Sequence, residues 1–214
     1  MPRKRRVWYP GAIYHVINRG NRKADIFRDR SDYIRFLEIV QSEQTRHDFT
    51  LHAVCLMTNH IHMLIGTKDE DLSMIIQHIL GRYAGCYNRK YELSGHVFQG
   101  RFTSSLVRND RYFLEVSRYI HMNPVKAQMV DSPADYLYSS YSLFVPGNVQ
   151  EERYCREADP KLYHLMRELV DTDGTLRLFG PTVLCKRRYR QFVTEKVSHS
   201  EHEEMIQKEM RDEW

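Results

Sequence analysis

The chain has 214 residues, of which 32 are Lys or Arg and 28 are Asp or Glu, so its formal charge is +4. Hydrophobic residues make up 42% of the chain, which is enough for a packed core and excludes a disordered protein. No apolar run approaches the roughly 18 residues of a membrane span, and no apolar stretch follows the basic N-terminus as in a secretory signal. The four cysteines form no Cys-x-x-Cys pair, which favours a reducing cytoplasm over a disulfide framework.

The charges are distributed unevenly along the chain. Residues 1–30 carry nine basic and two acidic side chains, residues 82–126 carry eight and three, and residues 195–214 carry three and seven. A basic body suggests a polyanionic partner, because each neutralised phosphate releases a condensed counterion. Tyrosines lie among these arginines and could stack on unpaired bases. A solvated basic surface over tyrosine-containing helices explains the same pattern, and charge alone does not separate the two interpretations.

The predicted elements follow one another as β-α-β-β-α-β, with one more helix after them. Apolar spacing and turn signals predict a strand over 12–18, a helix over 31–47, strands over 51–57 and 60–67, a helix over 72–91, a strand over 101–107 and a helix over 111–123. Ser31, Asp71 and Asp110 are the predicted helix caps, and Thr58-Asn59 is the turn of a hairpin. This order matches the ferredoxin-like split unit, an α+β fold in which a four-stranded antiparallel sheet carries helices on one face.

The composition changes after Pro146-Gly147. The part that follows is richer in charge and shows helical patterns near 160–170 and 186–197, with no further pair of strands. We therefore expect one domain over residues 1–147 and a helical extension over residues 148–214.

A pair of histidines, His60 and His62, lies on the second strand of the predicted hairpin. Side chains at i and i+2 of a strand share one face, so both imidazoles project together while Ile61, Met63 and Ile65 pack the other way. Two neighbouring imidazoles can hold one divalent ion. The pattern is weak by itself, because the chain contains 11 histidines and a pair on a solvated sheet face is common.

Tyr119 and Asn123 lie one turn apart on the predicted helix over 111–123. Pro124 disfavours helical dihedral angles at the residue before it, so we expect the helix to end at Asn123. Asn123 can then be the N-cap of a short helix over 124–129 that begins with proline. Tyr119 can likewise be an ordinary core tyrosine. The spacing alone leaves these structural interpretations open.

Four strings occur in order along the chain, namely YHVINRGNRKADIF, LHAVCLMTNHIHMLI, GHVFQGRF and SRYIHMNPVKAQMV. Together they closely resemble the REP-associated tyrosine transposases, a branch of the single-tyrosine, IS200-like transposases with a His-hydrophobic-His (HUH) motif. The resemblance covers about residues 1–147, and LVDTDGTLRLFG and RRYRQFVTE look like the helical extension of longer members. It implies a ferredoxin-like sheet with the two histidines on a central strand.

The resemblance also implies a role for each matching residue. His60 and His62 match the HUH pair, Tyr119 matches the nucleophile, and Asn123 matches the polar residue that completes the metal site, often Gln in relatives. Tyr119 would attack single-stranded DNA, leaving a 5′-phosphotyrosine and a free 3′-OH, with Mg²⁺ or Mn²⁺ as the cofactor. Relatives recognise an imperfect hairpin with a short unpaired guide 5′ to its stem.

Basic side chains are expected to contact this DNA: Arg3, Lys4, Arg5, Arg6, Arg19, Arg82, Arg101 and Arg118. Relatives differ in whether two subunits exchange the tyrosine helix, so both a monomer and a homodimer stay open. Two other functions also stay open. One is a DNA-hairpin-binding module without strand transfer, although the presence of every expected functional residue argues against it. The other is a metal-dependent hydrolase that uses activated water, with Tyr119 in the core.

Overall fold

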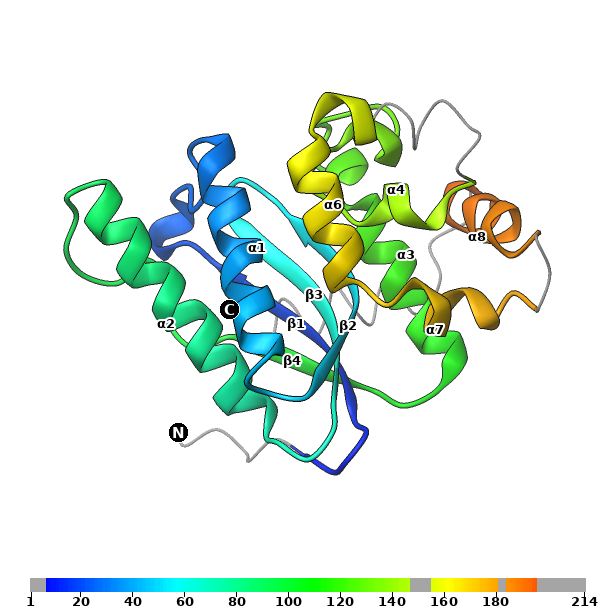
Figure 1. Cartoon of the computed structure of the whole chain (residues 1–214), viewed down its shortest axis with the longest axis horizontal. Helices are drawn as coiled ribbons and strands as arrows, with labels where there is room; N and C mark the ends of the chain where they lie inside the picture. Colours follow the sequence, from blue (N-terminus) through cyan, green and yellow to red (C-terminus); the bar gives the residue numbers. More distant parts are fainter. Residues whose placement is uncertain (1–6, 147–154, 181–183, 196–214) are drawn as a thin grey trace.

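The computed structural model describes residues 7–146, 155–180 and 184–195. Its centre is a four-stranded sheet in the order β2-β3-β1-β4, in which every neighbouring pair is antiparallel (Figure 1). The strands are β1 (Ile13–Arg19), β2 (Phe49–Leu56), β3 (His60–Thr67) and β4 (Thr103–Val107). The predicted α+β class and the ferredoxin-like order of elements are confirmed.

The helices lie on both faces of this sheet. They are α1 (Arg30–Gln44), α2 (Leu72–Lys90), α3 (Asp110–Lys126), α4 (Tyr141–Phe144), α6 (Pro160–Leu169), α7 (Thr172–Arg177) and α8 (Cys185–Thr194), with 3₁₀ turns η1 (Asn21–Lys23) and η2 (Pro133–Asp135). Ile61, Met63 and Ile65 of β3 belong to the larger core cluster, which includes the buried apolar residues of α1 and α2. Leu64 belongs to a second cluster with Val116 and other residues of α3. The sheet therefore separates two apolar layers, and α3 covers the face opposite to α1 and α2.

The β2–β3 hairpin forms as predicted. The N–H of Met57 donates to the carbonyl of His60 at 2.9 Å, which encloses the two-residue turn Thr58-Asn59. The residue that follows β1 also contacts this turn, because the N–H of Gly20 donates to the carbonyl of Asn59 at 2.8 Å. Since β3 lies between β2 and β1, the histidines that begin it are on a central strand.

Two of the three predicted helix caps are one or two residues away from the observed caps. Asp29, not Ser31, caps α1, and its carboxylate accepts a hydrogen bond from the N–H of Ser31 at 2.8 Å. Asn109, not Asp110, caps α3, with its side-chain oxygen accepting from the backbone three residues later. The cap at Asp71 is confirmed. In each case the residue with extended dihedral angles, just outside the helix, is the one that caps it.

The prediction that the tyrosine helix ends at Asn123 is wrong. α3 continues to Lys126 with Pro124 inside it, and the N–H of Ala127 still donates to the carbonyl of Asn123 at 2.9 Å. Proline costs this helix one hydrogen bond, at the carbonyl of Ile120. The apolar face of α3 is packed against the sheet, and this burial outweighs the local preference. The interpretation of Asn123 as the N-cap of a helix over 124–129 is therefore wrong as well.

Of the described helices after residue 155, α6 packs on α1, α7 on β2 and α8 on α3 (Figure 1). The helical patterns predicted near 160–170 and 186–197 correspond to α6 and α8, although residues 196–197 lie outside the described ranges. Arg30 of α1 donates two hydrogen bonds to the buried Asp159, at 2.5 and 2.7 Å. The division of the chain at residue 147 stays a prediction.

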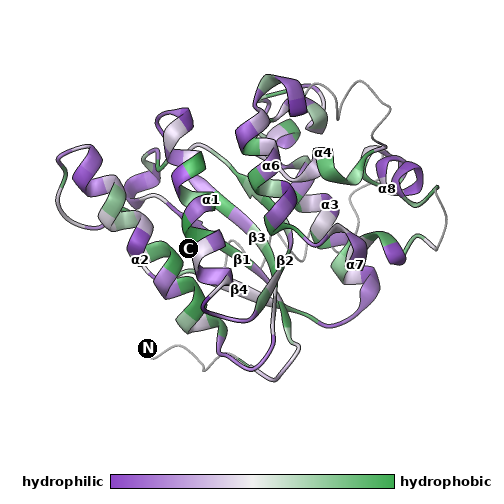
Figure 2. Ribbon diagram, viewed as in Figure 1, coloured by the Kyte–Doolittle hydropathy of each residue, from purple (hydrophilic) through white to green (hydrophobic). Residues whose placement is uncertain are grey.

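α8 is mostly hydrophilic, as Figure 2 shows, and only Tyr189 and Val193 among its residues are buried. Within the described ranges, no helix combines the length and the apolar character that crossing a membrane requires.

Candidate active site

His60 and His62 lie on the face of the sheet that α3 covers. Their ring centroids are 4.9 Å apart, and the ring of Tyr119 on α3 lies 5.7 Å from that of His62. His62 is fully buried, whereas His60 is partly exposed at the end of the strand. The alternation of β3 and the packing of α3 thus bring together the histidine pair and the tyrosine that the sequence indicated.

A third histidine, His15 of β1, belongs to the same group. Its ring stacks on that of His62 with centroids 5.4 Å apart and an interplanar angle of 19°. Its Nε2 lies 3.2 Å from Nδ1 of His62, and its ring meets that of Tyr119 edge-on at 5.8 Å. Sequence reasoning missed His15, because only the register that pairs Ile17 with His62 brings it here.

The hydrogen bonds of the HUH pair direct the same ring nitrogen of each histidine toward a ligand. Asn59 donates its amide to the carbonyl of Lys23, so its Oδ1 faces Nδ1 of His60 at 2.7 Å. His60 must then carry its hydrogen on Nδ1 and a lone pair on Nε2. Nδ1 of His62 is engaged with Nε2 of His15, and Nε2 of His62 is buried with no hydrogen-bond partner among the described residues. When Nδ1 of His62 is the donor, its Nε2 likewise carries the lone pair. Metal-binding histidines commonly donate their other ring N–H in this way, so the pair fits a metal ion.

Burial keeps these rings neutral. It lowers the pKa of His15 to about 3 and holds the pKa of His62 well below its ordinary value, with the neighbouring histidines adding to the effect. Burial and then the charge of Arg19 lower the pKa of His60 to about 4. Neutral imidazole is the form that binds a metal ion, so no proton has to leave at pH 7.

The candidate nucleophile and the third candidate ligand are both covered by protein. Tyr119 is 4% exposed, and the ammonium of Lys126 lies 4.8 Å from its ring centroid. The amide nitrogen of Asn123 donates to the carbonyl of Tyr119 at 2.9 Å. The amide oxygen is therefore the atom of Asn123 that can serve as a ligand.

The structure separates the basic residues predicted to contact DNA into different environments. Arg19 donates from Nε to Oε1 of Gln99 at 2.7 Å, and Arg101 lines a cavity of about 640 Å³ between α2 and the segment before β4. Arg82 is paired with the buried Glu43. Arg118 is 5% exposed and paired with Glu115, an arrangement typical of a structural role. The residues Arg3, Lys4, Arg5 and Arg6 lie outside the described ranges.

Comparison with known proteins places this site within a family. The family model described as "Transposase IS200 like" matches residues 9–123, which include the three histidines, Tyr119 and Asn123. The chain therefore belongs to the IS200-like transposases, which are DNA-cleaving enzymes. Members of the wider HUH group generally use a divalent metal ion.

Two known proteins similar to this chain are described as REP-associated tyrosine transposases. A protein of Haemophilus influenzae described as a REP-associated tyrosine transposase is 28% identical in an alignment of 145 residues that covers 62% of this chain and 82% of that protein. A structure of a REP-associated tyrosine transposase bound to a REP hairpin is similar in fold, with a TM-score of 0.56 and 21% identity over 65% of this chain and 82% of the other. The predicted resemblance to the REP-associated branch is confirmed.

Proposed function

We propose that this chain cleaves and rejoins single-stranded DNA near hairpin or REP-type sequences through a 5′-phosphotyrosine on Tyr119. The observation that carries the proposal is that the rings of His60, His62 and Tyr119 lie together on one face of the sheet, where Nε2 of His62 is buried without a hydrogen-bond partner among the described residues. Membership of the IS200-like family supports the same chemistry.

His60 and His62 would hold a Mg²⁺ or Mn²⁺ ion through Nε2, with the amide oxygen of Asn123 as a third ligand. Such a mixed set leaves positions for water and phosphate oxygen, whereas a structural zinc site is closed by four protein ligands. The bound ion supplies Lewis-acid polarisation of the scissile phosphate. Asn59 and His15 orient the two rings through their Nδ1 atoms.

Tyr119 would act as the nucleophile. Its phenolic oxygen forms a bond to phosphorus as the bond to the 3′ oxygen breaks; the phenol loses its proton and the 3′ oxygen gains one. The phosphotyrosine keeps the energy of the phosphoester, so a 3′-OH can attack it and rejoin strands without ATP. Because Tyr119 is 4% exposed, we expect DNA binding to uncover the hydroxyl.

Hairpin DNA is the proposed partner, and the solved relative in complex with a REP hairpin is consistent with it. Of the described basic residues, Arg19 and Arg101 are the better candidates for contacts with DNA, and the basic segment before residue 7 is a further candidate. Arg82 and Arg118 are weaker candidates, because each is held by a carboxylate of the protein. Both a monomer and a homodimer are compatible with this proposal.

The deciding experiment incubates labelled single-stranded hairpin DNA with the protein and Mn²⁺ and looks for a DNA–protein adduct that survives SDS. Tyr119→Phe should abolish the adduct and keep DNA binding within a few-fold, since only the hydroxyl is removed. Tyr112→Phe, on the same stripe of α3, is the matched control and should form the adduct normally. Cleavage without an adduct would favour the hydrolase, and binding without cleavage would favour the binding module.

Variants of the candidate ligands test the metal site. His60→Ala or His62→Ala should weaken metal binding and cleavage, and EDTA should do the same to the unmodified protein; cleavage that resists EDTA would exclude the metal role. Asn123→Asp should retain cleavage and Asn123→Gln should be partly active, because both keep an oxygen of the required kind. Asn123→Ser should be inactive, because its side chain is too short. Full activity of Asn123→Ser would exclude the ligand role.

A further inference from the structure

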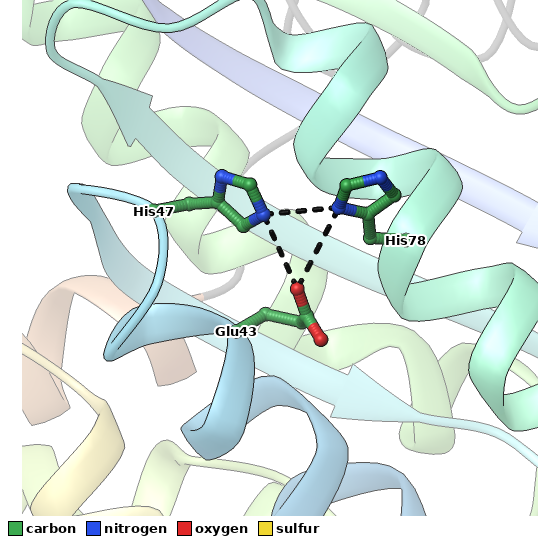
Figure 3. Close-up of side chains that lie close together, drawn as sticks. All are labelled: Glu43, His47 and His78. Carbon is green, nitrogen blue, oxygen red and sulfur yellow. Dashed lines mark hydrogen bonds and ion pairs between the residues drawn. The ribbon is translucent and has the colours of Figure 1, made fainter.

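A second group of potential metal ligands lies on the α1–α2 face of the sheet, opposite to the HUH pair. Glu43 comes from the last turn of α1, His47 from the connection between α1 and β2, and His78 from α2 (Figure 3). Their side chains point toward one another although up to 35 residues separate them in the sequence. This group plays no part in the proposed DNA chemistry.

The spacing of the three ligand atoms suits a small metal ion. Nε2 of His47 lies 3.3 Å from Oε2 of Glu43 and 3.0 Å from Nδ1 of His78, and the third side of the triangle is 3.8 Å. Ligands about 2.0–2.1 Å from zinc at tetrahedral angles lie about 3.3–3.4 Å apart. The observed distances bracket this value, so a shift of a few tenths of an ångström would complete the site.

The hydrogen bonds around the group leave lone pairs directed at its centre. Glu43 is fully buried, and its Oε2 has no hydrogen-bond partner among the described residues, while its Oε1 pairs with Arg82. Nδ1 of His47 lies 2.5 Å from a carboxylate oxygen of Glu70, which can only accept, so Nδ1 carries the hydrogen. With Nδ1 as the donor, Nε2 is the nitrogen of His47 that faces Nδ1 of His78 at 3.0 Å and Oε2 of Glu43 at 3.3 Å. A cation bound by these three atoms would give Oε2 of Glu43 the partner that it lacks in this buried position.

We propose that Glu43, His47 and His78 bind a first-row transition dication, with Zn²⁺ as the probe. Two imidazoles and one carboxylate favour such an ion over Mg²⁺, which prefers oxygen ligands. Glu70 orients His47 in the carboxylate–histidine–metal arrangement known from zinc proteins. The side chain of His78 is 51% exposed, which provides a route from solvent and room for a fourth ligand. The ion would join α1 to α2 and stabilise the folded chain.

Calorimetric titration with Zn²⁺ tests the proposal in the full chain carrying His60→Ala and His62→Ala, which remove the other candidate site. One Zn²⁺ should bind per chain. Adding His78→Gln should weaken binding by at least about 100-fold, and adding Glu70→Gln, which acts through His47, by about 10–100-fold. His164→Gln, an exposed histidine on α6, is the matched control and should leave the affinity unchanged.

Three results would overturn the proposal: no Zn²⁺ binding to the His60→Ala/His62→Ala chain, binding unaffected by His78→Gln, or an equal loss with His164→Gln. The first is expected if a shared proton, rather than a metal ion, holds the group together. Because His78 is half exposed, its replacement should not unfold the chain, and circular dichroism checks this. Failure of this test would not affect the proposed cleavage, which depends on the other face of the sheet.

Discussion

A buried chain of hydrogen bonds connects α8 to the tyrosine helix, and removing one hydroxyl tests its importance. The hydroxyl of Tyr189 lies 2.6 Å from Oγ of Ser117 and 2.7 Å from Nδ1 of His121, both on α3. Nε2 of His121 lies 2.9 Å from Oγ of Ser140, which accepts from the N–H of Val54 on β2 at 3.0 Å. The chain of bonds therefore runs from the sheet through α3 to α8.

Tyr189→Phe removes the hydroxyl and keeps the ring. Burial lowers the pKa of His121 to about 3, so the ring is neutral and its Nδ1 can accept from Tyr189 while Nε2 donates to Ser140. Without the hydroxyl, Nδ1 stays buried without its donor, which costs about 1–3 kcal/mol. The hydroxyl of Ser117 can instead donate to the backbone carbonyl four residues before it, so the loss of its partner costs less free energy. We expect the free energy of unfolding to fall by about 1–3 kcal/mol.

Urea denaturation of the two proteins measures this difference. Tyr9→Phe is the matched control, because Tyr9 is 46% exposed. This substitution should change the free energy of unfolding by no more than about 0.5 kcal/mol. If the free energy of unfolding of Tyr189→Phe also lies within about 0.5 kcal/mol of that of the unmodified protein, the hydroxyl does not stabilise the packing of α8 on α3. A loss well above 3 kcal/mol would mean that the substitution disturbs more than these bonds.

Three further outcomes are expected. Burial lowers the pKa of His15 and of His121 to about 3, so both rings stay neutral in the folded protein. In the unfolded chain they bind protons below about pH 6.5, so stability is highest above that pH. Each ring should therefore lower the free energy of unfolding by about 2 kcal/mol between pH 7 and pH 5. Urea denaturation at pH 7 and at pH 5, in the presence of EDTA, measures this loss of stability. A free energy of unfolding that does not change with pH would contradict the prediction. Gly20→Ala should lose more than about 2 kcal/mol, because its new Cβ would lie 2.0 Å from the carbonyl oxygen of Ala24. Gly81→Ala on α2 meets nothing within 4 Å and should gain about 0.5–1 kcal/mol, and thermal melts of both variants would show opposite shifts.

Local patterns in the sequence were sufficient for the order of elements and for part of the site. The alternation around His60 and His62 placed both imidazoles on one face, because side chains two apart on a strand always share a face. The two-residue turn at Thr58-Asn59 was also predictable from local sequence, because a hairpin this tight is defined by residues adjacent in the chain. Neither conclusion depends on what the strands pack against.

Contacts between distant parts of the chain decided the rest. His15 reaches His62 through the register of β1 against β3, and periodicity within either strand contains no information on that register. The continuation of α3 through Pro124 depends on burial against the sheet, which outweighs a local preference. Glu43 and His78 come together because α1 and α2 pack side by side, so only the tertiary structure could reveal the second candidate metal site.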